Sequence, residues 1–111
     1  MNKIVKKKWL KALKSGEYFK GKGALKRESN YPSYCCLGVL CELWGKGEWY
    51  QYEFALGRCG YKYKNVLFAS FPPPQYTHAI HISRDDVGIL ANLNDENDDW
   101  SKVIKYIEKN L

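Results

Sequence analysis

The sequence contains no long, uninterrupted hydrophobic run. Its first residues, MNKIVKKKWLKALKSG, are basic like those of a signal peptide, but lysines recur through them as far as Lys14. A signal peptide needs an apolar stretch of about 7–15 residues after its charged start. No later segment is apolar over the roughly 20 residues that a membrane-spanning helix requires. We therefore expect a cytoplasmic protein with no membrane partner.

The sequence also lacks the cysteine spacing of a disulfide scaffold or a zinc site. Cys35 and Cys36 are adjacent, Cys41 follows five residues after the second of them, and Cys59 is distant. Zinc sites favour pairs of cysteines two to four residues apart, with a second pair of ligands. On a helix, Cys36 and Cys41 would project about 140° apart, too far to share one ion. Cytoplasmic thiols stay reduced. We expect no disulfide, no metal and no cofactor.

Length and composition indicate one folded domain over residues 1–111. Hydrophobic residues make up 45% of the chain and aromatic residues 15%, which excludes an intrinsically disordered protein. The formal net charge is +6. That charge is compatible with an acidic partner, but values of about 2–8 are also ordinary for a small soluble domain.

The hydrophobic pattern predicts an α+β fold, with three to four helices packed on a small antiparallel sheet. A basic amphipathic helix should end near Gly16, and later helices should span residues 34–44, 83–93 and 99–110. Strands are predicted over residues 49–54, 61–68 and 77–82, with a turn at 57–60. The helix 34–44 is apolar on all sides, which places it at the centre of the fold. Gly38 in its middle indicates that another backbone packs closely against it.

The segment SYCCLGVLC (33–41) has two interpretations. A thiol in the first turn of a helix, such as that of Cys36, faces the positive end of the helix dipole, which favours the thiolate. His78 and His81 follow later in the chain, in the order of papain-like cysteine hydrolases. Because successive strand residues alternate, only one of these histidines could serve. The alternative is that the cysteines are core residues, since free cysteine packs as a small hydrophobe. We favour the core interpretation and keep the hydrolase as the alternative.

Three segments carry a resemblance to a family of small proteins from tailed phages and prophages. These are WLKALKSGEYFKGKGAL (9–25), YCCLGVLCEL (34–43) and LANLND (90–95), the last followed by a closing helix. The resembling family has a YCCLGVLC(D/E)L motif and a C-terminal LND segment. The likeness covers about half of the chain, and residues 49–82 depart from it. It implies a phage setting in an infected bacterial host, and it implies no reaction.

Small accessory phage proteins often act by binding, so we predict a non-catalytic protein that inhibits or sequesters a host defence component. The partner would be a host protein, a protein–nucleic-acid complex or a nucleotide signal. Direct nucleic-acid binding is an alternative, because basic residues interleaved with aromatic ones can pair phosphates and stack bases. The oligomeric state is left open. The predicted binding residues are basic or aromatic: Lys22, Lys26, Arg27, Tyr50, Tyr52, Arg58, Tyr61, Lys62, Tyr63 and Lys64.

Overall fold

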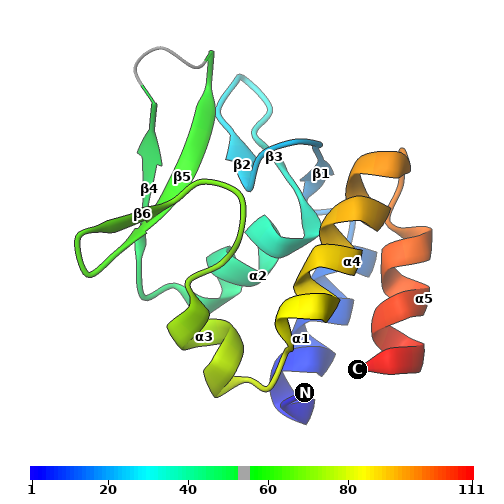
Figure 1. The fold of residues 1–111 in the computed structure, drawn as a ribbon. Helices are drawn as coiled ribbons and strands as arrows, with labels where there is room; N and C mark the ends of the chain where they lie inside the picture. Colours follow the sequence, from blue (N-terminus) through cyan, green and yellow to red (C-terminus); the bar gives the residue numbers. More distant parts are fainter. Residues whose placement is uncertain (53–55) are drawn as a thin grey trace.

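The computed structural model describes residues 1–52 and 56–111, which contain five helices and six strands (Figure 1). The helices are α1 (Lys3–Lys14), α2 (Cys36–Trp44), α3 (Pro74–Ala79), α4 (Arg84–Glu96) and α5 (Ser101–Asn110). The strands are β1 (Phe19–Lys20), β2 (Lys26–Arg27), β3 (Ser33–Tyr34), β4 (Glu48–Gln51), β5 (Arg58–Tyr63) and β6 (Val66–Phe68). The predicted α+β class is confirmed.

The sheet has the strand order β1-β3-β2-β5-β4, with β6 paired to β5. It is mixed rather than purely antiparallel as predicted, because β1 runs parallel to β3. The other pairs are antiparallel. Three of the strands, β1, β2 and β3, are only two residues long.

Helix α2 lies at the centre of the molecule, between the sheet and the helices α1 and α4 (Figure 1). Its residues from Cys36 to Cys41 are all buried, and they join one core that draws side chains from every helix. The central position of this helix is therefore confirmed. It begins two residues later than predicted, because Ser33–Tyr34 pair within the sheet and Cys35 is the N-cap.

The predicted strand at 77–82 is wrong. Residues 74–79 form helix α3, with Pro74 at a first-turn position, where the missing N–H of proline costs nothing and its fixed φ suits the helix. The chain then turns at His81, whose φ is 61°. The segment resembled a strand because Ile80 and Ile82 are apolar and two residues apart. Both are buried, and both lie beyond the end of the helix.

The predicted strand at 61–68 is two strands. Lys64 and Asn65 have φ values of 50° and 63°, and two successive residues of positive φ are typical of a tight hairpin turn. The turn predicted at 57–60 is also wrong, since β5 already begins at Arg58. The strand predicted at 49–54 corresponds to β4, and Phe54, the last residue of that prediction, lies outside the described residues.

Ser83 is the N-cap of α4. Ser83 Oγ accepts a hydrogen bond from the Asp86 backbone N at 3.1 Å and donates one to the Asp86 carboxylate at 2.8 Å.

The two chain ends lie near each other (Figure 1), and the Met1 amino group donates to the Leu111 carbonyl at 3.3 Å. In the described part of the chain, no helix combines the length and the apolar character needed to cross a bilayer.

Candidate functional site: the outer sheet face

The cysteine thiols of α2 are buried. Cys36 and Cys41 have no exposed surface, and Cys35 is 6% exposed. Burial raises the pKa of the Cys35 thiol to about 11, and it raises those of Cys36 and Cys41 well above the ordinary value. The helix terminus does not offset this desolvation, so these groups remain neutral thiols near neutral pH.

The Cys36 thiol is not paired with a histidine. Its sulfur donates to the Leu90 carbonyl oxygen at 3.7 Å, while His78 and His81 lie on the surface, at α3 and just after it. Among the described residues, no hydrogen bond joins either imidazole to the thiol. The arrangement that a cysteine hydrolase needs is therefore not assembled here.

Iodoacetamide at about pH 8 is expected to leave Cys35, Cys36 and Cys41 unmodified in the folded protein, because a protonated, buried thiol is a poor nucleophile. Peptide mass spectrometry after brief labelling measures this. The control is the same reaction in denaturant, where all three thiols should be alkylated. Rapid labelling of Cys36 in the native protein would restore the hydrolase interpretation.

The predicted binding residues are distributed between the two faces of the sheet. Side chains of paired residues on neighbouring strands point to the same face, and successive residues alternate. The inner face packs on α2 through Tyr61, which is 1% exposed and whose ring contacts that of Trp44 at a centroid distance of 6.2 Å. The register then places Arg58, Lys62 and Tyr50 on the opposite, outer face.

Three predicted binding residues belong to the inner face. Tyr61 is a core residue, because its ring is buried and its hydroxyl accepts from Gly47 N at 2.6 Å. Tyr63 packs against the Trp44 ring, with centroids 4.7 Å apart. Lys26 has a side chain 12% exposed, pairs with Glu28 at 3.3 Å and lies over the rings of Tyr34 and Trp49. Tyr61 therefore contributes to packing and offers almost no surface to a partner.

Two other predicted cations lie away from either face. Lys22 pairs with Asp98 at 2.7 Å, so its charge is already partnered. Lys64 lies in the β5–β6 turn with its ammonium 5.4 Å from the centroid of the neighbouring Tyr63 ring. Neither residue adds to a common binding surface with the strands.

The outer sheet face carries one row of side chains across four strands. The pairings Phe19↔Ser33, Arg27↔Ser33 and Arg27↔Arg58 place Phe19, Ser33, Arg27 and Arg58 side by side. Tyr52 extends the row, since its backbone N donates to the Arg58 carbonyl at 2.9 Å. Sequence alternation alone could not have shown this row, because β1, β2 and β3 are too short to carry a pattern.

The two arginines of this row face each other across strands β2 and β5. Like charges in directly opposed positions destabilise a sheet. Among the described residues, neither guanidinium has a carboxylate within ion-pair distance. Arg58 donates to Ser70 Oγ at 3.3 Å, while its buried Nε has no hydrogen-bond partner in the part of the chain that the structure describes. Within the described residues the two guanidinium groups thus have no carboxylate partner, and guanidinium groups bind a carboxylate or a phosphate.

Aromatic side chains flank the arginine pair. Tyr50 is 48% exposed and its ring contacts that of Tyr52 edge-on, with centroids 6.0 Å apart. At the other end of the row, Phe19 and Tyr31 form a second exposed edge-on pair at 5.8 Å. Glu48 is paired with Lys62 in β5, so this acidic residue also lies on the outer sheet face. The face is therefore basic, with aromatic ends.

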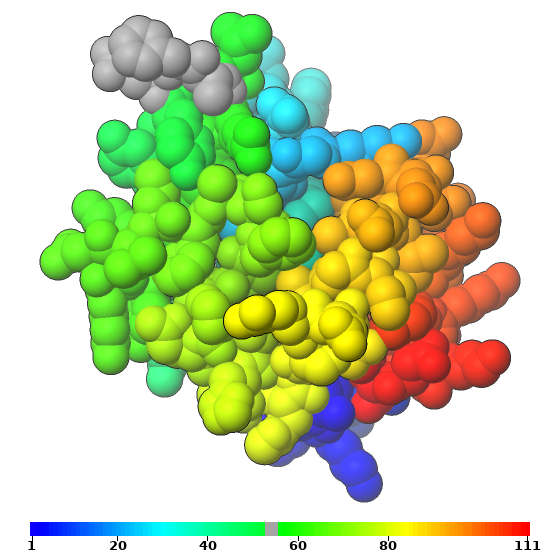
Figure 2. Space-filling model, in the orientation of Figure 1, coloured from blue at the N-terminus to red at the C-terminus, as the bar shows by residue number. Residues whose placement is uncertain are grey.

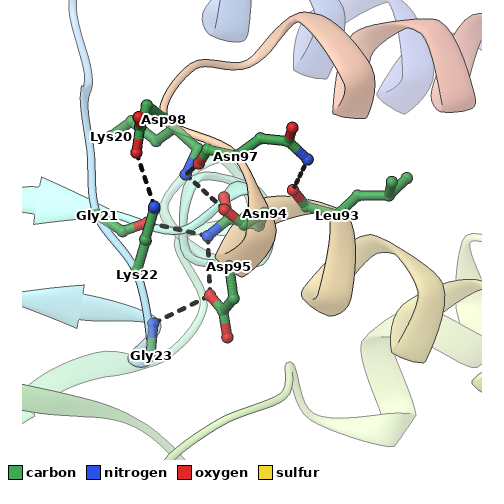
Figure 3. A network of polar contacts seen from close by, with 9 residues as sticks. All are labelled: Lys20, Gly21, Lys22, Gly23, Leu93, Asn94, Asp95, Asn97 and Asp98. Carbon is green, nitrogen blue, oxygen red and sulfur yellow. Dashed lines mark hydrogen bonds and ion pairs between the residues drawn. The ribbon is translucent and has the colours of Figure 1, made fainter.

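Behind the short strands lies a polar network around Asn94, which is fully buried (Figure 3). Its side-chain oxygen accepts from Cys36 N at 3.0 Å, and its amide donates to the Gly21 carbonyl at 2.9 Å and to Asp95 at 3.2 Å. Asn94 thus satisfies a free N–H at the start of α2 and holds the chain after β1. The segments YCCLG and LND are therefore in direct contact through the Asn94 side chain.

Lysine and aspartate side chains complete this network (Figure 3). Lys20 donates to the carbonyls of Asn94 and Asn97 at the end of α4, both at 2.6 Å, where helical carbonyls lack partners. Burial lowers the pKa of this ammonium. Asp95 accepts from Gly23 N at 3.0 Å. The structural role of Lys20 and Asp95 in this network was not predicted from the sequence.

Comparison with known proteins assigns the family. Residues 1–111 match the family described as "Domain of unknown function (DUF8296)". The chain belongs to this family. No curated protein and no solved structure matches the chain. The family's description names no activity.

Proposed function

We propose that this chain is a non-catalytic binding protein that holds an acidic partner on the outer sheet face. The observation that carries the proposal is the opposed pair of Arg27 and Arg58, which lacks an acidic partner within the described residues. Opposed like charges lower the stability of the sheet, so an external anion that bridges them gains both attraction and relief of repulsion.

The unpartnered Nε of Arg58 supports the same proposal. A buried donor without an acceptor costs free energy, and in a native protein such a group calls for an explanation such as a bound ion or water. An incoming carboxylate or phosphate would supply two acceptor oxygens to a planar guanidinium. The Arg58 guanidinium also donates to Ser70 Oγ at 3.3 Å, which restrains the side chain.

The resemblance to small phage and prophage proteins supports a biological setting in an infected bacterial host. Under this proposal the partner is a host defence component with an acidic surface, and binding blocks that component. The exposed rings of Tyr50, Phe19 and Tyr31 supply apolar contact area beside the charges, the combination found at the centre of protein interfaces.

A second candidate function is single-stranded nucleic-acid binding. Its supporting observation is that exposed aromatic rings and arginines share one sheet face, since rings stack on bases and guanidinium groups pair with phosphates. The separating measurement is salt dependence. Binding through phosphates weakens steeply as salt rises, whereas binding to a protein through an apolar centre changes less.

Replacing both arginines with glutamine (Arg27→Gln with Arg58→Gln) is expected to weaken partner binding at least tenfold, because each charge-assisted hydrogen bond contributes about 1.5–3 kcal/mol. The same variant should unfold at equal or slightly higher denaturant concentration, since removing opposed charges relieves about 0.2–1 kcal/mol of repulsion. Matched pull-downs from host lysate, read by mass spectrometry, and anisotropy with a labelled single-stranded oligonucleotide measure the binding.

The control is Lys105→Gln with Lys109→Gln, which removes the same charge from exposed positions of α5. A partner retained by the native chain and by this control, but lost by the arginine variant, supports the proposal. Salt-sensitive oligonucleotide binding with the same pattern supports the second candidate. Equal loss in both double variants, or no partner and no oligonucleotide bound at any salt concentration, would contradict the outer sheet face as a binding site.

A further inference from the structure

A cleft of about 540 Å³ opens between the chain after β6 and the start of α4. The two segments that form it, coloured yellow-green and yellow, both lie on the face drawn in Figure 2. Clefts of about 300–1,000 Å³ are the size that holds small molecules. This cleft is formed by residues that the outer sheet face does not use.

The walls of the cleft are mostly apolar. Pro72, Ile82 and Val87 are buried residues that line it, and Phe71 at its edge is half exposed. Thr77 also lines it, but its hydroxyl already donates to the Pro74 carbonyl at 3.3 Å. An apolar lining of this kind favours a ligand with a ring-sized apolar body.

Gly88 on the wall has no role in packing the chain itself. It lies within α4, where glycine destabilises a helix relative to alanine. A Cβ added at Gly38 would collide with a backbone oxygen at 1.8 Å, whereas one added at Gly88 meets nothing within 4 Å in the described chain. Glycine at such a position permits a close approach to the helix backbone from outside. The open space above Gly88 is the cleft.

The cationic group at the cleft is the Arg84 guanidinium. Arg84 and His78 are its ionisable lining residues, both exposed. The nearby carboxylate of Asp86 is already engaged, since it accepts from Ser83 Oγ at 2.8 Å and from the Tyr106 hydroxyl at 2.5 Å. Asp85 is exposed and is not part of the lining. An anionic group at the mouth of the cleft would therefore meet the Arg84 guanidinium.

We infer that this cleft binds a small molecule that combines a ring-sized apolar body with one anionic group. The apolar body lies against Val87 and Ile82 above Gly88, and the anion pairs with Arg84. This inference is independent of the proposed function, because no residue of the outer sheet face lines the cleft.

The test uses 8-anilinonaphthalene-1-sulfonate, an apolar anion, and its uncharged counterpart N-phenyl-1-naphthylamine, with fluorescence titration of the full chain. Gly88→Leu is expected to weaken binding of both probes at least tenfold, because the new side chain starts from a Cβ with nothing within 4 Å and occupies space in the cleft. Arg84→Gln is expected to weaken binding of the anionic probe about three- to tenfold and to leave binding of the uncharged probe unchanged.

Two controls separate the cleft from other surfaces. Ile89→Leu changes an exposed neighbour on α4 that does not line the cleft, and it should bind both probes as the native chain does. Near-ultraviolet circular dichroism checks that every variant retains native packing. The inference is overturned if Gly88→Leu remains folded and binds both probes with native affinity, if Arg84→Gln affects both probes equally, or if neither probe binds the native chain.

Discussion

Gly38→Ala is expected to destabilise the protein by about 4 kcal/mol or more, at the extreme of single substitutions. A Cβ on residue 38 would lie 1.8 Å from the Leu25 carbonyl oxygen and 2.7 Å from its carbonyl carbon. Both are backbone atoms of a fully buried residue, and the same oxygen accepts the Cys35 N–H at 3.1 Å. The clash can be relieved only by moving α2 away from the chain before β2.

Urea unfolding followed by circular dichroism measures this effect, and a total stability of about 5–15 kcal/mol leaves room for the variant to be largely unfolded. Gly88→Ala is the matched control, because a Cβ there meets nothing within 4 Å. It should stabilise the protein by about 0.5–1 kcal/mol through helix propensity. If Gly38→Ala were as stable as Gly88→Ala, the close approach of Leu25 to α2 would be refuted.

The central helix is the part of the fold that sequence reasoning predicted best. Its apolar residues on all sides, with Gly38 as the exception, indicated a buried helix against which another backbone packs. The structure identifies that backbone as Leu25. The first turn was misplaced because Cys35, a residue that is not a usual cap, accepts the Gly38 N–H through its sulfur at 3.3 Å, while serine is the more common N-cap.

The segment 74–82 shows where periodicity fails. It contains buried residues two apart, Ile80 and Ile82, which suggested a strand. Pro74 is the first residue of the helix, and a proline at the first turn suits the start of a helix. Short apolar segments do not distinguish the two structures. The residue at the turn, His81, has a positive φ that no local pattern predicts.

The residue types of the candidate site could be predicted from the sequence, but their arrangement on the two faces of the sheet could not. Arg27, Arg58, Lys62, Tyr50 and Tyr52 do share the outer sheet face. Tyr61 and Lys26 carry the same chemistry and face inward. The distinction depends on register between strands of two residues, which is set by tertiary contacts rather than by the alternation of the strands themselves.

Those contacts come from the polar network around Asn94, which links the interior to the outer sheet face. Phe19 precedes Lys20 in β1, and Lys20 is held by two carbonyls at the end of α4. Gly21 and Gly23, between β1 and β2, are held by Asn94 and Asp95. Strands this short have few hydrogen bonds of their own, so the network supplies much of what keeps Phe19 and Arg27 in one row.

Asn94→Leu is therefore expected to destabilise the protein by about 2–4 kcal/mol, because it leaves the buried Cys36 N–H and the Gly21 carbonyl without their partners. The loss should concentrate locally, with faster amide hydrogen exchange at the start of α2 and along β1 and β3 than in α5. Urea unfolding and hydrogen exchange measure the two effects.

Asn92→Leu provides the control, since it makes the same chemical change at an exposed position of α4 and should alter stability by less than about 0.5 kcal/mol. If the network positions the outer sheet face, Asn94→Leu must also weaken binding to any partner that Arg27 and Arg58 hold, although Asn94 itself is buried. Native stability in Asn94→Leu, or an equal loss in both leucine variants, would show that packing alone sets the register of the short strands.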